Sequence, residues 1–156
     1  MTVVTQFITA DGSDDGDLVD IRRHYVQDGN VIENPYGNFP ETSAFDSISN
    51  EYCNAYKDLF GEFNDFLDTG SLKTMGDSLA RGMVLAISVW DDYGSHMQWL
   101  DGISPPDGDV SQPGVVRGPC SADSGNPDDM RGEFPDAFVT FKNLKIGTLG
   151  SFLPKH

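Results

Sequence analysis

Short stretches in which apolar and polar residues alternate dominate the first part of the chain. Residues 2–9 and 18–27 follow this two-residue period, which is typical of strands with one buried face. Asp28-Gly29 stands between the second stretch and the apolar residues 30–32, and this dipeptide favours a type I′ turn. The pattern therefore predicts three strands, the last two joined as a β-hairpin.

Two further segments have the composition of strands. Residues 83–89 form a continuous apolar run with β-branched members, which ends at Asp91-Asp92 and predicts a buried strand. Residues 137–146 predict the last strand of the chain. Between them, residues 102–135 are dense in Pro, Gly, Ser and Asp and predict a long loop.

Two other segments repeat apolar residues at helical spacing. Residues 46–60 predict a surface helix with one buried face. The residues on that face are Ile48, Tyr52, Ala55, Tyr56 and Leu59. A shorter helix is predicted to begin with Ser71 as its N-cap and to end just before Gly82. Its apolar face would consist of Leu72, Met75 and Leu79.

Composition narrows the class of protein. The 156 residues include 17 Gly and 9 Pro, which is typical of a loop-rich β protein rather than a helical bundle. Ten Lys or Arg against 25 Asp or Glu give a formal net charge of −15, so nucleic-acid phosphates and anionic membrane headgroups are repelled. We therefore expect no nucleic-acid partner and no membrane partner.

Both tryptophans of the protein, Trp90 and Trp99, lie in one short acidic segment. An indole covers the apolar C–H face of a sugar ring, while neighbouring carboxylates accept hydrogen bonds from the sugar hydroxyls. This combination predicts a carbohydrate-binding surface. The alternative is that both indoles are ordinary core aromatics, since large aromatic side chains are usually buried.

Other candidate sites are weaker. Residues 11–17 have the spacing of the beginning of a calcium-binding loop, but Arg22 stands at the twelfth position, where a bidentate Glu is required. A solvated acidic hairpin is the better interpretation. The three histidines lack metal-ligand spacing, so we predict no metal site and no cofactor. Asp91 and Asp92 are adjacent and would point to opposite faces of a strand, so they cannot act together as a catalytic pair.

The segment around Trp90 closely resembles a known family. Residues 82–93 read Gly-Met-Val-Leu-Ala-Ile-Ser-Val-Trp-Asp-Asp-Tyr and resemble glycoside hydrolase family 7, the cellobiohydrolases and endoglucanases that cut cellulose. Further segments resemble the family in the same order along the chain: residues 2–7, 23–29, 51–53, 113–120 and 139–147. Because these matches are collinear up to about Ser151, the resemblance covers nearly the whole chain.

The resemblance implies an all-β fold, as part of a concanavalin-like β-jelly-roll sandwich with long loops and one or two short helices. It also implies a retaining mechanism in which two carboxyl groups about 5 to 5.5 Å apart carry out double displacement. The family signature for these groups, Glu-x-Asp-x-x-Glu, does not occur in this sequence. In family members it precedes the segment that matches residues 2–7. We therefore interpret residues 1–151 as the C-terminal portion of a single catalytic domain and residues 152–156 as a tail.

The resemblance also carries substrate contacts, but no catalytic role, onto particular residues. Trp90 matches a tryptophan that stacks on a sugar on the non-leaving side of the cleavage point, and Trp99 matches one that stacks on the first leaving-side sugar. Arg117 matches an arginine that hydrogen-bonds the departing cellobiose unit; its alternative is a loop-closing ion pair with a nearby Asp. Ser88 and Asp91, which flank Trp90, are further candidates for contacts with sugar hydroxyls.

The resemblance finally implies partners and a location. The expected partners are cellulose or a cello-oligosaccharide and the missing N-terminal part of the same catalytic domain. Cys53 and Cys120 are not expected to bond to each other, because the matching cysteines of the family pair with partners earlier in the sequence. The parent enzyme is expected to be extracellular, although this chain begins without a signal peptide.

The sequence as a whole predicts the C-terminal portion of a retaining β-1,4-glucanase, a cellobiohydrolase-like cellulase. Its contribution would be sugar stacking and product-side subsites. The alternative is a non-catalytic carbohydrate-binding polypeptide or an inactive fragment. Because the signature carboxylates are absent, we expect no hydrolysis by this chain alone.

Overall fold

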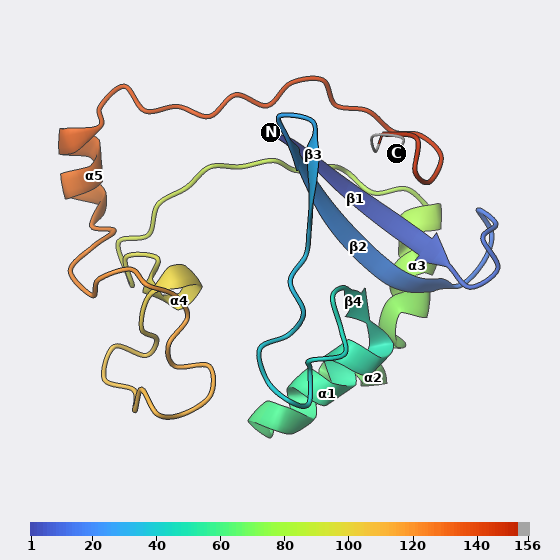
Figure 1. The fold of residues 1–156 in the computed structure, drawn as a ribbon, viewed down its shortest axis with the longest axis horizontal. Helices are drawn as coiled ribbons and strands as arrows, with labels where there is room; N and C mark the ends of the chain where they lie inside the picture. Colours follow the sequence, from blue (N-terminus) through green and yellow to red (C-terminus); the bar gives the residue numbers. More distant parts are fainter. Residues whose placement is uncertain (153–156) are drawn as a thin grey trace. The chain divides into compact units, whose positions relative to one another are not determined.

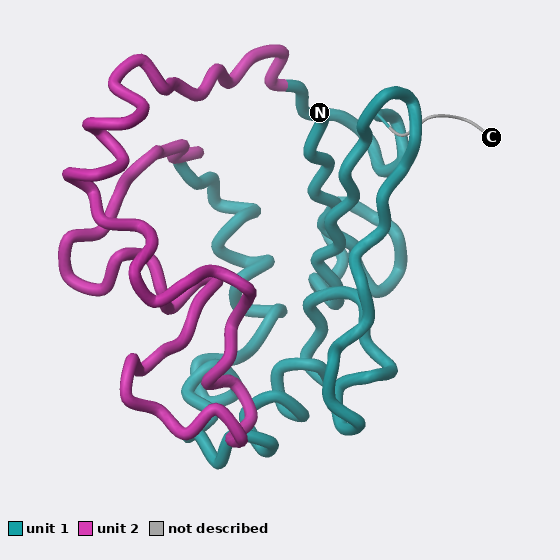
Figure 2. The backbone as a smooth tube through the Cα atoms, turned by 60° about the vertical axis from the view of Figure 1, so that its left-hand side comes forward, with its two compact units in different colours: residues 1–84, 145–156 teal, residues 85–144 magenta. Residues whose placement is uncertain are grey.

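The structure is a computed structural model that describes residues 1–152. The chain forms two compact units (Figure 2). Among the described residues, unit 1, drawn in teal, comprises residues 1–84 and 145–152, and unit 2, drawn in magenta, comprises residues 85–144. Apart from Phe152, the predicted tail at residues 152–156 lies outside the described residues.

Unit 1 is built around a four-stranded sheet whose strand pairs are all antiparallel (Figure 1). The strands are β1 (Thr2–Thr9), β2 (Leu18–Gln27), β3 (Asn30–Glu33) and β4 (Ile48–Ser49). β2 is central, since it pairs with each of the other three. The three strands predicted from alternation are confirmed, and β4 is an addition to them.

Both predicted turns of this sheet are confirmed. Asp28 and Gly29 have φ angles of 52° and 80°, the positive values that a type I′ turn requires between β2 and β3. The acidic residues 10–17 connect β1 to β2, and the Ala10 N–H donates to the Asp17 carbonyl at 2.9 Å. The segment that resembles a calcium loop is therefore a hairpin connection.

The helices of unit 1 are α1 (Asn50–Phe60), α2 (Asp65–Asp68) and α3 (Ser71–Ala80). α1 begins later than the predicted residue 46, because Ser49 is its N-cap and accepts a hydrogen bond from the Tyr52 N–H at 3.1 Å. The predicted Ile48 belongs to β4 and is exposed. α1 ends where Gly61 adopts the left-handed conformation, with φ 62°.

α3 packs against β2 and forms the core of unit 1. Leu72 is 0% exposed, and Leu18 at the start of β2 is also buried. A Cβ placed on Gly76 would lie 2.7 Å from the Leu18 Cβ, so only glycine allows the helix to approach the strand this closely. The apolar contact is therefore small but tightly packed.

Two details of the α3 prediction are wrong. Gly70, with φ 96°, occupies the N-cap position that we assigned to Ser71, and it provides no side-chain cap. Met75 is exposed rather than buried, because the inward face follows the i, i+4 spacing of Leu72 and Gly76. Gly82 lies beyond the helix end with φ 93°, as predicted.

The two remaining predicted strands are also wrong. Residues 83–89 and 137–146 run as chain without a strand ladder (Figure 1). Val84 is 94% exposed. β-branched and apolar residues favour an extended backbone, but a strand forms only when a neighbouring strand completes its hydrogen bonds. No described residue supplies that partner for either segment.

Unit 2 contains two short helices, α4 (Gln98–Asp101) and α5 (Pro127–Glu133), separated by irregular chain. α5 lies inside the segment predicted as loop, so that prediction is wrong at residues 127–133. Its signals were present in the sequence: the Asn126 side chain caps the helix by accepting from the Asp128 N–H at 3.0 Å, and Pro127 follows. No helix within the described part of the chain is long and apolar enough to cross a membrane.

Candidate functional site

The candidate site lies in unit 2 and centres on the two tryptophans. The Trp90 and Trp99 rings are stacked, with centroids 5.9 Å apart and planes inclined by 23°. Trp90 is 59% exposed and Trp99 is 39% exposed. Within the described part of the chain both indoles are thus accessible to solvent.

Asp92 holds the turn that joins the two tryptophans. Its Oδ1 accepts hydrogen bonds from the backbone N–H groups of Gly94 at 2.7 Å and Ser95 at 3.2 Å. Its Oδ2 accepts from the Ser95 hydroxyl and from the Trp99 indole Nε1 at 3.2 Å. These donors, the Ser95 hydroxyl first, lower the pKa of Asp92 to about 2. Asp92 is therefore an ionised support for the turn and for the Trp99 ring.

Asp91 is held by Arg131 of α5, although its side chain remains exposed. The Arg131 guanidinium donates from Nε to Asp91 Oδ2 and from Nη2 to Oδ1, each at 3.0 Å. Arg131 Nη1 also donates to the Tyr93 hydroxyl at 2.9 Å, and that hydroxyl donates to Asp128 Oδ1 at 2.7 Å. The bond to Asp128 raises the pKa of Tyr93, because it stabilises the protonated phenol.

Gln98 anchors α4 directly before Trp99. Its side chain is buried, and Nε2 donates to the carbonyls of Ser121 at 2.9 Å and Ser124 at 3.1 Å. The helix that carries Trp99 is thus attached to a distant part of the same unit. A Cβ at position 102 would lie 1.8 Å from Gln98 Oε1, so a larger residue there would displace the Gln98 side chain.

The other predicted site residues lie apart from this group. Arg117 is exposed, and within residues 1–152 its guanidinium forms no ion pair, so the loop-closing pair with an Asp is absent. Backbone bonds close the loop instead: the Arg117 N–H donates to the Gly102 carbonyl at 2.7 Å, next to a bridge between Ile103 and Val116. Ser88 is exposed in the unpaired chain before Trp90. The structure thus brings together Trp90, Asp91 and Trp99.

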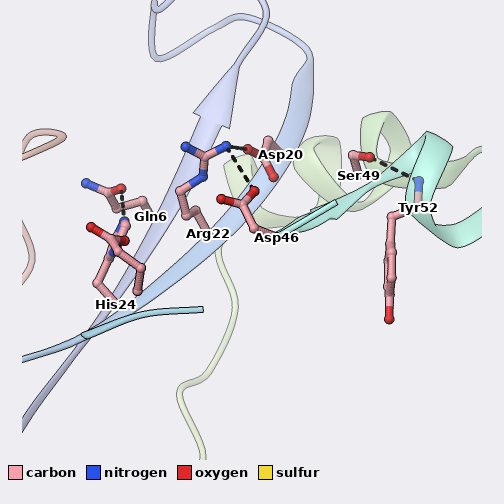
Figure 3. Close-up of polar contacts among 8 residues, drawn as sticks. Gln6, Asp20, Arg22, His24, Asp46, Ser49 and Tyr52 are labelled. Atoms are coloured by element: carbon pink, nitrogen blue, oxygen red, sulfur yellow. Dashed lines mark hydrogen bonds and ion pairs between the residues drawn. The ribbon is translucent and has the colours of Figure 1, made fainter. Parts of the chain in front are cut away.

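The sheet of unit 1 carries a polar cluster that sequence reasoning missed (Figure 3). His24 on β2 is 7% exposed; its Nε2 shares a hydrogen bond with Gln6 Oε1 on β1 at 3.1 Å, and its Nδ1 contacts the Glu33 carboxylate on β3. Strand register could have found this group, because it places His24 directly opposite Glu33.

Arg22 lies on the same sheet face as His24, two residues earlier. Its Nη2 donates to Asp20 Oδ2 at 3.0 Å and lies 3.9 Å from Asp46 Oδ1 (Figure 3). Asp20, Arg22 and His24 follow the two-residue period of β2, so the sequence contained the signal for one polar sheet face.

The described residues include neither a metal-binding cluster nor a reactive cysteine. Among residues 1–152 there is no cluster of three or more His, Cys, Asp or Glu that could hold a metal ion. Cys53 and Cys120 are free thiols. Burial raises the pKa of Cys53, and a hydrogen bond with Asp101 raises that of Cys120, so both thiols are poor nucleophiles at neutral pH.

An exposed indole beside carboxylates suits the apolar C–H face and the hydroxyls of a sugar ring. The model of glycosyl hydrolase family 7 matches residues 1–153, and the chain therefore belongs to this family. It is part of the family's all-β jelly-roll fold.

Solved structures agree with this assignment. The chain is similar to a cellobiohydrolase from Daphnia pulex, with 49% identity over 84% of this chain and 29% of that one and a TM-score of 0.76. It is also similar to a cellobiohydrolase from Melanocarpus albomyces complexed with cellotetraose, with 35% identity, 86% and 29% coverage and a TM-score of 0.65. An endocellulase from Humicola insolens matches at 35% identity, 85% and 28% coverage and a TM-score of 0.63. The chain spans about 30% of the length of these proteins.

Proposed function

We propose that the chain forms the sugar-binding, product-side part of a retaining β-1,4-glucanase that acts on cellulose. The observation that carries this proposal is the exposed, stacked pair Trp90 and Trp99 in a member of this family. A similar structure, from Melanocarpus albomyces, is complexed with cellotetraose. A cello-oligosaccharide is therefore the ligand to test first.

The proposed roles follow from the chemistry of each side chain. Trp90 and Trp99 stack on sugar rings on the two sides of the cleavage point. Arg117, exposed and without an ion pair in the described part of the chain, donates to the hydroxyls of the departing cellobiose unit. Ser88 and Asp91 contact sugar hydroxyls beside Trp90. Two hydrogen bonds from the Arg131 guanidinium already occupy one lone pair on each Asp91 oxygen, so sugar hydroxyls would use the remaining lone pairs.

The chemical step requires groups from outside this sequence. Glu-x-Asp-x-x-Glu does not occur in it, so the nucleophile and the acid/base of the retaining mechanism come from the rest of the catalytic domain. That part of the domain is the proposed protein partner, and it would also pair with residues 83–89 and 137–146. As in a cellulase that meets insoluble substrate, the whole enzyme would act outside the cell.

A second candidate is a carbohydrate-binding polypeptide that performs no chemistry. The presence of the indole pair without the signature carboxylates favours it. The two candidates differ in one outcome. Joining this chain to the signature-bearing part of a family member yields cellulase activity only if the first candidate is right.

The direct experiment is calorimetry of the full chain with cellotetraose, alongside hydrolysis of an aryl cellobioside. We expect saturable binding and no turnover. Maltotetraose, with α-linkages, serves as the control ligand and should bind more weakly. A folded chain that does not bind cellotetraose contradicts the proposal, and so does turnover that disappears when one of the chain's own carboxylates is replaced.

A further inference from the structure

We infer that Arg131 is a positioning residue for the indole pair and that it holds Trp90 in place through Asp91 and Tyr93. The expected effect on sugar affinity rests on the proposed function. The arrangement of the indoles themselves is independent of any ligand.

The contacts join two segments that lie about forty residues apart in sequence. Arg131 makes two parallel hydrogen bonds to the carboxylate of Asp91, the residue that directly follows Trp90. It makes a third to the Tyr93 hydroxyl, and its guanidinium carbon lies 5.2 Å from the centre of the Tyr93 ring. Tyr93 in turn donates to Asp128, one turn before Arg131 in α5. The four residues close a ring of contacts.

The geometry of the fork matters more than its charge. Two parallel N–H···O bonds fix both the distance and the orientation of a carboxylate, which a single ammonium contact does not do. Because Arg131 and Asp91 are exposed, their ion pair contributes little to the stability of the fold. What the fork determines is the direction in which the chain at residues 90–93 runs.

In the described structure, no strand pairing supports the segment that leads into Trp90. Residues 83–89, which lead into Trp90, are unpaired within the described structure. Trp99, by contrast, is held by Asp92 and by α4. Arg131 therefore supplies for Trp90 the support that Asp92 supplies for Trp99, and the stacked pair depends on both.

The test compares Arg131→Ala and Arg131→Lys with the unaltered full chain. Arg81→Ala is the matched control, because Arg81 also stands at a helix end with an exposed side chain and donates to the Ser78 hydroxyl. The first readout is the far-ultraviolet circular dichroism couplet that two stacked indoles produce, with Trp99→Phe defining the signal of an unpaired Trp90. The second is cellotetraose affinity from tryptophan fluorescence.

We expect Arg131→Ala and Arg131→Lys to lose most of the couplet, while melting temperature changes by about 2 °C or less. We expect cellotetraose affinity to fall on the order of threefold to tenfold, as for coupled residues in one network. Arg81→Ala should match the unaltered chain. An unaltered couplet in both Arg131 variants overturns the inference, as does the absence of a couplet in the unaltered chain. If the couplet responds as expected but no form binds cellotetraose, the positioning role stands and the proposed function fails.

Discussion

Unit 1 and unit 2 hold their chain by different kinds of interaction. In unit 1 the strand ladder of β1, β2 and β3 fixes the backbone, and Leu72 of α3 is wholly buried. In unit 2 the buried Gln98 side chain donates to two backbone carbonyls, and Pro127 at the start of α5 is also buried. Asp92 and Arg131 complete the support there with further side-chain hydrogen bonds.

Because of this difference, we expect different residues to determine the stability of the fold and the binding of a ligand. A buried apolar side chain contributes free energy of unfolding in proportion to the area it removes from water. Exposed hydrogen bonds and ion pairs contribute much less to unfolding, but they orient the groups they join. We therefore expect substitutions in unit 1 to act on folding and substitutions around the indoles of unit 2 to act on ligand binding.

The largest effect is expected for Leu72→Ala. Removing a fully buried leucine should lower the free energy of unfolding by about 2–5 kcal/mol, through lost burial and a residual cavity. Met75→Ala on the same helix is the control, because Met75 is exposed and its loss should cost about 0.5 kcal/mol or less. Urea unfolding followed by circular dichroism measures both. Equal losses for the two variants would remove the distinction between the units.

The next largest effect is expected for Trp99→Ala, which should change ligand affinity rather than stability. We expect cellotetraose binding to weaken by about 1–3 kcal/mol, taking base–aromatic stacking as the analogue, which is roughly a fivefold to 150-fold loss of affinity. The free energy of unfolding should change little, because the indole is partly exposed. Phe63→Ala, an exposed aromatic in unit 1, is the control and should leave affinity unchanged. A large loss of stability with unaltered affinity would make Trp99 a packing residue.

The smallest effect concerns the protonation of Asp92. Its pKa in the folded chain is about 2, below the ordinary 3.8, so its support of Trp99 is complete above about pH 4 and is lost as pH falls through about 2. The Trp99 indole N–H signal in NMR should therefore shift with a midpoint near pH 2. Asp92→Asn, which does not titrate, should lack this step. A midpoint near pH 4 would mean that the hydrogen bonds to Asp92 do not stabilise its ionised form.

The two units also differ in how well the sequence predicted them. The strands of unit 1 and the turn at Asp28-Gly29 followed from local pattern, because alternation and turn chemistry act over a few residues. The segment 83–89 has the composition of a strand, yet it is unpaired. Its state depends on a partner strand, and no local pattern contains that information.

In the candidate site, the sequence indicated the indoles but not their support. Trp90 and Trp99 were evident from their position in an acidic segment, and the structure stacks them. The contact of Asp91 with Arg131 was not predictable, because it joins residues forty positions apart across irregular chain. α5, which carries Arg131, was missed although Asn126-Pro127 gives a clear helix start.

We expect the indole pair of unit 2 to be the surface on which this chain holds cello-oligosaccharide. The most direct test is a ¹⁵N-resolved NMR titration of the full chain with cellotetraose. Because the protein has two tryptophans, only two indole N–H signals occur, and Trp99→Phe assigns them. We expect both signals to shift on one binding curve. Two signals that stay in place while cellotetraose saturates the chain elsewhere, or while it does not bind at all, would contradict it.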